Sequence, residues 1–304
     1  MVEFSLLTTE AINPMTRMID ECSTLEMLEL INQQDALVPV SVAKEIPNIA
    51  RAVDLLTELL RAGGRMIYVG AGTSGRLGVL DASECPPTFG SPREMVQAYI
   101  AGGDDALRNA AEGCEDMSGD AEALVERLAV TEADAVIGVS ASGVTPYVAA
   151  AARKARSFGA HTIGVINNKA SGLDALFDIC ISPVTGPEVI MGSTRMKAGT
   201  AQKLVLNMLT TCTMVKLGKV YNNMMVDMRA TNYKLRMRSI RIIQTIVDVE
   251  PSIAEKALDA ADGDTKVAIM MLMTKLDRET VQHVLARNHG ILKQALKEVK
   301  ELEP

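Results

Sequence analysis

A stretch rich in glycine and hydroxyl residues follows an apolar run near residue 65. The run Arg65–Gly70 has the composition of a buried strand. The stretch Gly70-Ala-Gly-Thr-Ser-Gly-Arg-Leu-Gly78 then leads into a segment with helical character, residues 77–82. Glycines let a backbone approach a ligand closely, and a helix N-terminus offers unbonded N–H groups with a favourable dipole. The spacing therefore predicts an anion site whose ligand is a phosphorylated small molecule.

The kind of phosphate follows from the residues around the glycines. Gly70-x-Gly72-x-x-Gly75 matches the dinucleotide fingerprint, which also needs an acidic residue roughly 20 residues later. The second strand is expected at 95–101, and the acids after it, Asp104 and Asp105, come late. Two adjacent hydroxyls, Thr73 and Ser74, suit a dianionic phosphate monoester better than a shared pyrophosphate. We therefore favour a monoester site at Gly72, Thr73 and Ser74.

A second hydroxyl-rich turn supports the monoester interpretation. The apolar run 135–140 leads into Ser140, Ser142 and Thr145, and Pro146 opens a helix that we expect to reach about residue 158. Loops at the carboxyl ends of parallel strands converge on one ligand site. The alternative is that each Ser or Thr only caps its own helix. Because both turns follow strands, we expect them to hold one phosphate from two sides.

Two glutamates are positioned to do acid–base chemistry. Glu84 lies in the segment 81–90, which we expect to end the helix, and Pro86 and Pro87 are expected to fix the chain just after it. Glu115 follows the second strand and a short helix from about residue 104. Carboxylates in different environments can divide the acid and base roles. Glu112, in the same segment as Glu115, is a candidate substrate contact. For any single glutamate, the alternative is a solvated surface residue.

The two cysteines beside these glutamates, Cys85 and Cys114, are expected to pack rather than react. A thiolate nucleophile needs a cationic or histidine partner, and neither cysteine has one next to it in the sequence.

A third segment, 185–203, contains several further candidates. Ser193 or Thr194 is expected to cap a helix, which places Arg195 and Lys197 in its first turn. Cations are unfavourable there, so we expect them to serve an anionic ligand. Glu188 is expected either to bond a sugar hydroxyl or to anchor the turn. Ser193, Thr194 and Arg195 are therefore candidate substrate-binding residues, with a cap and surface charges as the alternative.

The order of elements predicts an α/β fold with a parallel sheet covered by helices on both faces. Continuous apolar runs of the kind found in buried parallel strands occur at 65–70, 95–101, 135–140, 161–167 and 179–184. A helix is expected at 41–62, with Pro47 either kinking it or lying in its first turn. From about residue 193 the chain is expected to be entirely helical. We expect a sugar-phosphate-binding domain at 1–250, with a helical N-terminal extension, and a small helical subdomain at 251–304.

Composition excludes several classes of function. The chain has 304 residues, 48% of them hydrophobic, and a net charge of −7 without a basic tract, so nucleic-acid binding is not expected. No apolar run is long enough to span a membrane and the first residues do not form a signal peptide, which predicts a cytoplasmic protein. Five scattered cysteines and three histidines show no metal-ligand spacing, so neither a disulfide framework nor a metal site is expected.

Three motifs together resemble a known family. The stretch Gly72-Thr-Ser-Gly-Arg-Leu-Gly-Val-Leu-Asp-Ala-Ser-Glu-Cys-Pro-Pro-Thr88 resembles the signature of bacterial N-acetylmuramic acid 6-phosphate etherases. Residues 185–203 resemble a motif that these enzymes share with the glucokinase regulatory protein, and residues 7–13 are similar to the etherase start. The resemblance covers essentially the whole chain. It implies a sugar isomerase domain, with a flavodoxin-like three-layer parallel sheet of about five strands, and a helical C-terminal part. It also implies a homodimer with active sites near the subunit interface and no metal or redox cofactor.

The resemblance further implies a reaction on a phosphorylated amino sugar. It predicts removal of the lactyl ether, with Glu115 as the base at C2 and Glu84 as the acid at the ether oxygen. Two rivals share the fold: a non-catalytic sugar-phosphate sensor similar to the glucokinase regulatory protein, and an aldose–ketose isomerase.

Overall fold

The chain forms two compact units in a computed structural model that describes residues 7–169, 171–228 and 232–302. The first unit comprises Met1–Ser83 and Arg93–Thr210, and the second comprises Glu84–Pro92 and Thr211–Pro304. The boundary expected at residue 250 lies inside the second unit. It separates helices α9 (Tyr233–Val247) and α10 (Pro251–Ala260), which pack against each other.

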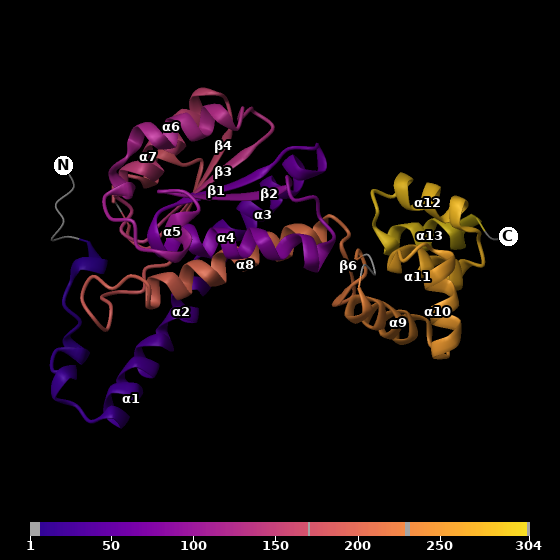
Figure 1. The fold of residues 1–304 in the computed structure, drawn as a ribbon, viewed down its shortest axis with the longest axis horizontal. Coiled ribbons are helices and arrows are strands. Elements are labelled where there is room, and N and C mark those ends of the chain that lie inside the picture. Colours follow the sequence, from indigo (N-terminus) through magenta and orange to yellow (C-terminus); the bar gives the residue numbers. More distant parts are fainter. Residues whose placement is uncertain (1–6, 170, 229–231, 303–304) are drawn as a thin grey trace. The chain divides into compact units, whose positions relative to one another are not determined.

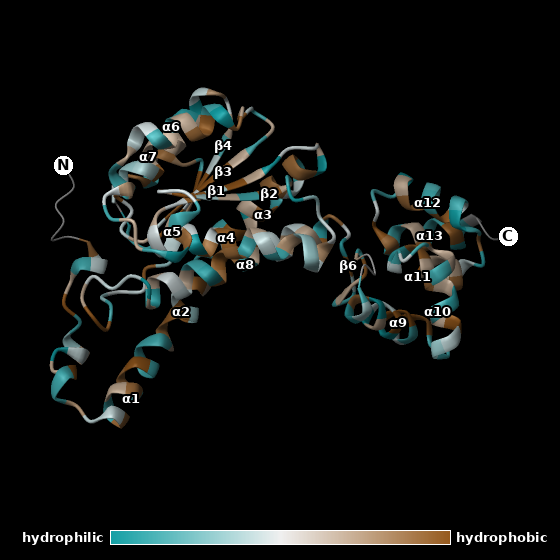
Figure 2. Cartoon of the chain, in the orientation of Figure 1, coloured by the Kyte–Doolittle hydropathy of each residue, from teal (hydrophilic) through white to brown (hydrophobic). Residues whose placement is uncertain are grey.

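The first unit is built on a five-stranded parallel sheet (Figure 1). Its strands, in the order β2-β1-β3-β4-β5 across the sheet, are β1 (Met66–Gly70), β2 (Val96–Ile100), β3 (Ala135–Ser140), β4 (His161–Ile166) and β5 (Ile179–Ile181). All four neighbouring pairs are parallel. The hydrophobic residues of β1 and β3 are coloured brown in Figure 2, and every residue of these two strands is buried. The expected α/β fold with about five parallel strands is confirmed.

Helices lie on both faces of this sheet. The helices up to residue 216 are α1 (Thr24–Asp35), α2 (Leu37–Ala43), α3 (Ile46–Arg61), α4 (Gly72–Phe89), α5 (Asp105–Arg108), α6 (Ser118–Arg127), α7 (Pro146–Ser157) and α8 (Lys197–Lys216), with a 3₁₀ turn η5 (Cys114–Asp116). Helices α6 and α7 share a buried core with Ile67 and Val69 of β1. On the other face, the Asp81 carboxylate of α4 accepts hydrogen bonds from Tyr68 of β1 and from Asn207 and Thr210 of α8. Pro47 lies in the first turn of α3 rather than kinking it.

Helix α4 runs further than the prolines suggest. Pro86 and Pro87 both lie inside the helix, which continues to Phe89. An interior proline costs a backbone hydrogen bond and crowds the preceding turn, and buried Cys85 and Phe89 hold the final turns against that cost. The helix ends at Gly90, which has φ +62° and donates its N–H to the Pro86 carbonyl. The helix therefore ends inside the expected segment, 81–90, after passing through both prolines.

The second unit holds a helical core and one short hairpin. Its elements after α8 are β6 (Val220–Tyr221), β7 (Met224–Met225), α9, α10, α11 (Thr265–Thr274), α12 (Arg278–Arg287) and α13 (Leu292–Leu302). Helices α9 to α13 bury a common apolar cluster that includes Ile243, Leu258 and Ile269. The antiparallel pair β6–β7 contradicts the expectation of an entirely helical segment. Its turn is Asn222-Asn223, and Asn222 adopts φ +54°, a conformation that asparagine tolerates.

No helix among the described residues is both long and apolar enough to cross a membrane.

Candidate active site

In the turn between β1 and α4, two parts of the backbone approach each other closely, and α4 begins within this turn. A Cβ atom at Gly75 would lie 2.6 Å from Cγ1 of Ile100 and 2.8 Å from the carbonyl oxygen of Gly70. Gly72 has φ +52°, and it begins α4. The N–H groups of a helix's first turn lack acceptors within the helix. The turn therefore presents N–H groups that suit an anion, as the glycine spacing predicts.

Replacing Gly75 with alanine tests this close approach. We expect Gly75→Ala to displace the turn, because its methyl group would meet the Gly70 carbonyl, which cannot move away as a flexible side chain can. Overpacking of this kind destabilises a fold by about 1–3 kcal/mol, so the midpoint of thermal unfolding should fall by several degrees. Gly119→Ala is the matched control: it lies in α6, nothing lies within 4 Å of its added Cβ, and the change should leave or raise the midpoint. Equal midpoints for Gly75→Ala and the parent chain would contradict the close packing.

Hydrogen bonds also shape the second turn, between β3 and α7. The hydroxyl oxygens of Ser140 and Thr145 lie 2.8 Å apart, and the Gly143 N–H donates to the Ser140 hydroxyl at 3.0 Å. Thr145 precedes the first residue of α7 but makes no capping hydrogen bond. Ser140 is buried, so it braces the turn from within, whereas Ser142 and Thr145 line a pocket. Helix capping, the alternative for this turn, does not account for Thr145.

One pocket of about 450 Å³ brings residues from both turns together. The predicted site residues that line it are Gly72, Thr73, Ser74, Glu115, Ser142, Thr145 and Thr194. The Ser74 hydroxyl already donates to the Gln202 side-chain oxygen at 2.9 Å, so Ser74 can serve an anion only through its backbone N–H. Among the described residues, the hydroxyls of Thr73 and Ser142 donate to no protein acceptor, which leaves both protons for a ligand.

The pocket also contains acidic residues that sequence reasoning missed, Glu10 and Asp116. Glu10 is brought there by Asn168, which follows β4. The Asn168 Oδ1 accepts from the Thr8 N–H at 2.8 Å and from the Thr8 hydroxyl at 2.6 Å, and its Nδ2 donates to the carbonyls of Ala141 and Ser142. This amide joins the N-terminal segment to the second turn. Every charged residue among the described ones lining this pocket is acidic, so the pocket offers an anion hydroxyls and N–H groups rather than cationic side chains.

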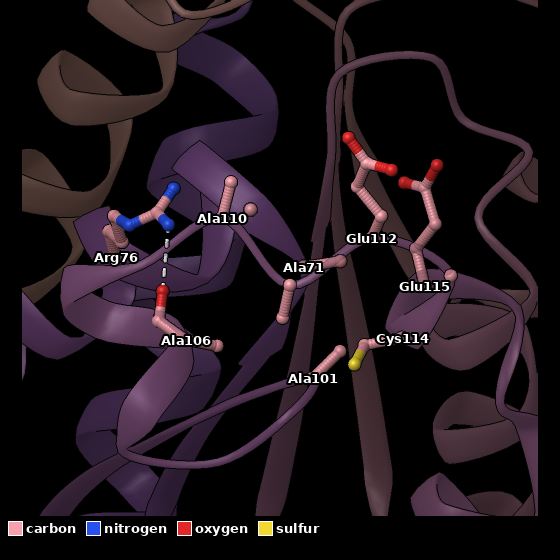
Figure 3. A pocket seen from close by; sticks show the side chains of 11 residues that line it. Ala71, Arg76, Ala101, Ala106, Ala110, Glu112, Cys114 and Glu115 are labelled. Carbon is pink, nitrogen blue, oxygen red and sulfur yellow. Dashed lines mark hydrogen bonds between the residues drawn. The ribbon is translucent and has the colours of Figure 1, made fainter.

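A smaller pocket of about 210 Å³ adjoins the first one and shares Ala71, Gly72 and Glu115 with it. Figure 3 shows the carboxylates of Glu112 and Glu115 extending to the same side of the loop that carries them. Both side chains are exposed, and η5 holds Glu115. The structure therefore places Glu115 at the boundary between the two pockets, with Glu112 in the smaller one.

Other predicted site residues lie outside these pockets. Glu84 is exposed on α4, twelve residues after Gly72, in the segment that belongs to the second unit. Ser140, Ser193 and Arg195 are not among the lining residues of either pocket, and Arg195 is exposed. Their roles remain predictions.

The start of α8 corrects the capping prediction for Ser193 and Thr194. The helix begins at Lys197, and the buried Glu188 carboxylate accepts the N–H groups of Lys197 and Ala198, both at 2.9 Å. Burial raises the pKa of Glu188, and the two N–H bonds oppose that shift. Of the two roles considered for Glu188, anchoring the turn is the one seen.

Lys197 is buried rather than directed at a ligand. Its Nζ donates to the side-chain oxygen of Gln34 at 2.9 Å, and burial lowers its pKa. The expectation that Lys197 serves an anionic ligand was therefore wrong. Among the described residues, no cluster of three or more His, Cys, Asp or Glu side chains is arranged to hold a metal ion.

Family models match two overlapping parts of the chain. Residues 48–155 match the glucokinase regulatory protein N-terminal SIS domain, and residues 107–212 match the SIS domain. Among solved structures, a candidate phosphosugar isomerase involved in capsule formation from Bacteroides fragilis superposes with a TM-score of 0.51. That match has 20% sequence identity and covers 66% of this chain and 95% of the other, so it shows a shared fold.

Curated relatives match over nearly the full length. An N-acetylmuramic acid 6-phosphate etherase from Caldanaerobacter subterraneus subsp. tengcongensis is 50% identical over 96% of this chain and 95% of the relative. Relatives with the same description from Pectobacterium atrosepticum and Streptomyces coelicolor are 51% and 50% identical, over 95% and 97% of this chain and 96% and 94% of their own lengths.

Proposed function

Because this chain belongs to the N-acetylmuramic acid 6-phosphate etherase family, we propose that it cleaves the lactyl ether of N-acetylmuramic acid 6-phosphate. The products are N-acetylglucosamine 6-phosphate and D-lactate, which makes the chain a carbon–oxygen lyase. The observation that supports this function most directly is the pocket that both hydroxyl-rich turns line. Its volume of about 450 Å³ lies within the range of small-molecule sites, about 300–1,000 Å³.

The phosphate is the part of the substrate that these turns suit. The N–H groups at the start of α4 and the free hydroxyl protons of Thr73 and Ser142 are donors, and phosphate oxygens are acceptors. Holding the phosphate at this end of the pocket fixes the position of the sugar carbons. Positioning of this kind lowers the activation barrier because binding has already met the entropy cost of bringing the reacting groups together.

The proposed chemistry is an elimination followed by hydration. Opening of the sugar ring creates an aldehyde at C1, which acidifies the proton on C2. The Glu115 carboxylate takes that proton, and the carboxyl group of Glu84 gives a proton to the lactate oxygen as the C3–O bond breaks. Water then adds to C3 of the unsaturated intermediate while the Glu84 carboxylate takes its proton, and C2 regains a proton. The same carboxyl group acts as acid and then as base, so no net proton is gained or lost.

An isotope experiment tests this function. The purified chain is incubated with N-acetylmuramic acid 6-phosphate in water enriched in ¹⁸O and deuterium, and the D-lactate and the sugar product are measured. We expect lactate release, solvent oxygen at C3 and solvent hydrogen at C2 of the product. Absence of lactate would contradict the etherase and favour the sugar-phosphate sensor, which the match to the glucokinase regulatory protein domain keeps as the second candidate. Lactate with the original oxygen retained at C3 would contradict elimination and hydration.

We also propose that the chain acts as a cytoplasmic homodimer. Large apolar side chains are exposed along the N-terminal segment, including Ile12 at 60%, Met15 at 62%, Leu25 at 66% and Leu28 at 59%. Exposed apolar surface of this extent is typical of an interaction site, and a second copy of the chain is the partner that the family resemblance implies. Light scattering that gives the mass of a single chain at assay concentration would contradict the dimer.

A further inference from the structure

The guanidinium group of Arg76 ties the phosphate-binding helix to the loop that leads to Glu115. Arg76 lies on α4, one turn after Gly72. Its Nε donates to the Leu107 carbonyl at 3.1 Å, and its Nη2 donates to the carbonyls of Ala106 at 2.7 Å and Asn109 at 3.1 Å. Figure 3 shows the bond to Ala106, between two residues that line the smaller pocket. Among the described residues, Arg76 forms no ion pair, so its charged donors serve backbone carbonyls alone.

These carbonyls are the ones a helix end leaves without partners. Helix α5 has four residues, and the last carbonyls of a helix have no N–H donors of their own. Basic side chains can satisfy them. Arg76 supplies this cap from another helix, so the end of α5 is held against α4 rather than being free to shift along it.

The loop after α5 has few other restraints before Glu115. Residues 110–113 are exposed, and Gly113 adopts φ +77°. Beyond them Cys114 is only half-buried, packed beside a core that includes Ala101 and Val69. The Arg76 cap restrains the start of this loop, and at its end η5 is held by the Cys114 contact and by packing against α7.

We propose that Arg76 is a positioning residue that couples the phosphate-binding turn to the Glu115 carboxylate. This inference rests on the proposed function, since it assigns Arg76 to the alignment of the C2 base. The helix that presents N–H groups to the phosphate also fixes, through this guanidinium, the loop that carries the base. Arg76 is therefore the side chain that links the start of this loop directly to the phosphate-binding helix.

Two substitutions separate this role from simple packing. Arg76→Met keeps the aliphatic stem but removes all donors, and Arg76→Lys keeps one charged donor group that cannot reproduce the planar fork. A misplacement of about 1 Å can lower a rate by about 10²-fold. We expect kcat to fall by about 10²-fold for Arg76→Met and by about 10-fold for Arg76→Lys, with KM within about 3-fold of the parent, because the phosphate turn itself is intact.

A positioning role for Arg76 predicts that its substitution slows both the C2 proton exchange and the lactate release. Exchange of the C2 hydrogen with solvent should fall in parallel with lactate release in both variants, since Glu115 performs the first step. Arg108→Met is the matched control: this arginine lies on α5, is exposed and makes no hydrogen bond or ion pair among the described residues, so its kinetics should be unchanged. Unchanged kcat in Arg76→Met, or a raised KM at constant kcat, would overturn the proposal.

A second measurement does not depend on activity. Amide hydrogen exchange followed by mass spectrometry should show faster exchange in residues 105–117 of both Arg76 variants, and unchanged exchange in β1 and β3. Unaltered exchange in 105–117 would overturn the tether whatever the activity. If the parent chain released no lactate, the proposed function would fail, but this exchange result would still decide whether Arg76 holds the loop.

Discussion

Glu115→Gln should abolish both lactate release and exchange of the C2 hydrogen with solvent. Glutamine keeps nearly the same shape but cannot accept the C2 proton, and general-base catalysis contributes about 10²–10⁴-fold to a rate. We expect kcat to fall by about 10³-fold while KM changes little, because the two hydroxyl-rich turns rather than Glu115 hold the phosphate. Steady-state lactate assays and deuterium incorporation at C2 measure the two effects. Glu115 is exposed, so thermal unfolding should be unaffected.

Two comparisons make this result specific. Glu122→Gln, on the exposed surface of α6, changes a nearby carboxylate outside both pockets and should leave kcat unchanged. Glu112→Gln tests the other carboxylate of the same loop, which we assign to substrate binding, so it should raise KM and retain C2 exchange. If Glu112→Gln lost C2 exchange and Glu115→Gln kept it, the base would be Glu112 and our assignment would be wrong.

Glu84→Gln should separate the two halves of the reaction. The acid that protonates the lactate oxygen is missing, so we expect lactate release to fall by about 10³-fold. Removal of the C2 proton by Glu115 comes first, so exchange of that proton with solvent should persist. Proton NMR of the substrate in deuterated water follows exchange, and a lactate assay follows release.

The matched control for Glu84 is another exposed glutamate on the surface, Glu94. Glu94→Gln should release lactate at the parent rate, because Glu94, although equally exposed, lies outside the 72–88 motif on which the role of Glu84 rests. Normal release by Glu84→Gln would refute its assignment as the acid. Loss of both release and exchange would place Glu84 in the first step instead of the second.

Much of the fold could be predicted from the sequence because buried strands have a simple pattern of apolar residues. All five strands were predicted, since parallel strands covered on both faces are continuous apolar runs such as Met66–Gly70. The continuation of α4 through Pro86 and Pro87 was not predicted, because whether these prolines break a helix depends on tertiary packing around Cys85 and Phe89. The β6–β7 hairpin was missed although its Asn222-Asn223 turn is a recognisable signal.

The residues of the candidate site also fall into those that the sequence predicts and those that it does not. Residues that lie next to their element in sequence, such as Thr73 and Ser142, could be placed in a pocket from the strand–turn–helix pattern. Residues brought in by distant contacts could not. Glu10 depends on Asn168, and the buried Glu188 reaches the start of α8 through a fold that no local pattern encodes. Arg76 was visible in the motif, but its three carbonyl partners lie in α5 and just after it, about thirty residues further along the chain.

The contact between Thr8 and Asn168 has a consequence for the order in which this protein is made. The two residues are 160 positions apart, so the N-terminal segment leaves the ribosome long before its partner exists. At about 5–20 residues per second, the delay is roughly 8 to 32 s. During that time both phosphate-binding turns emerge, but the N-terminal segment that carries Glu10 still lacks its partner, Asn168. This side of the binding pocket therefore forms only after translation has passed the fourth strand, and Thr194, which also lines the pocket, follows later still.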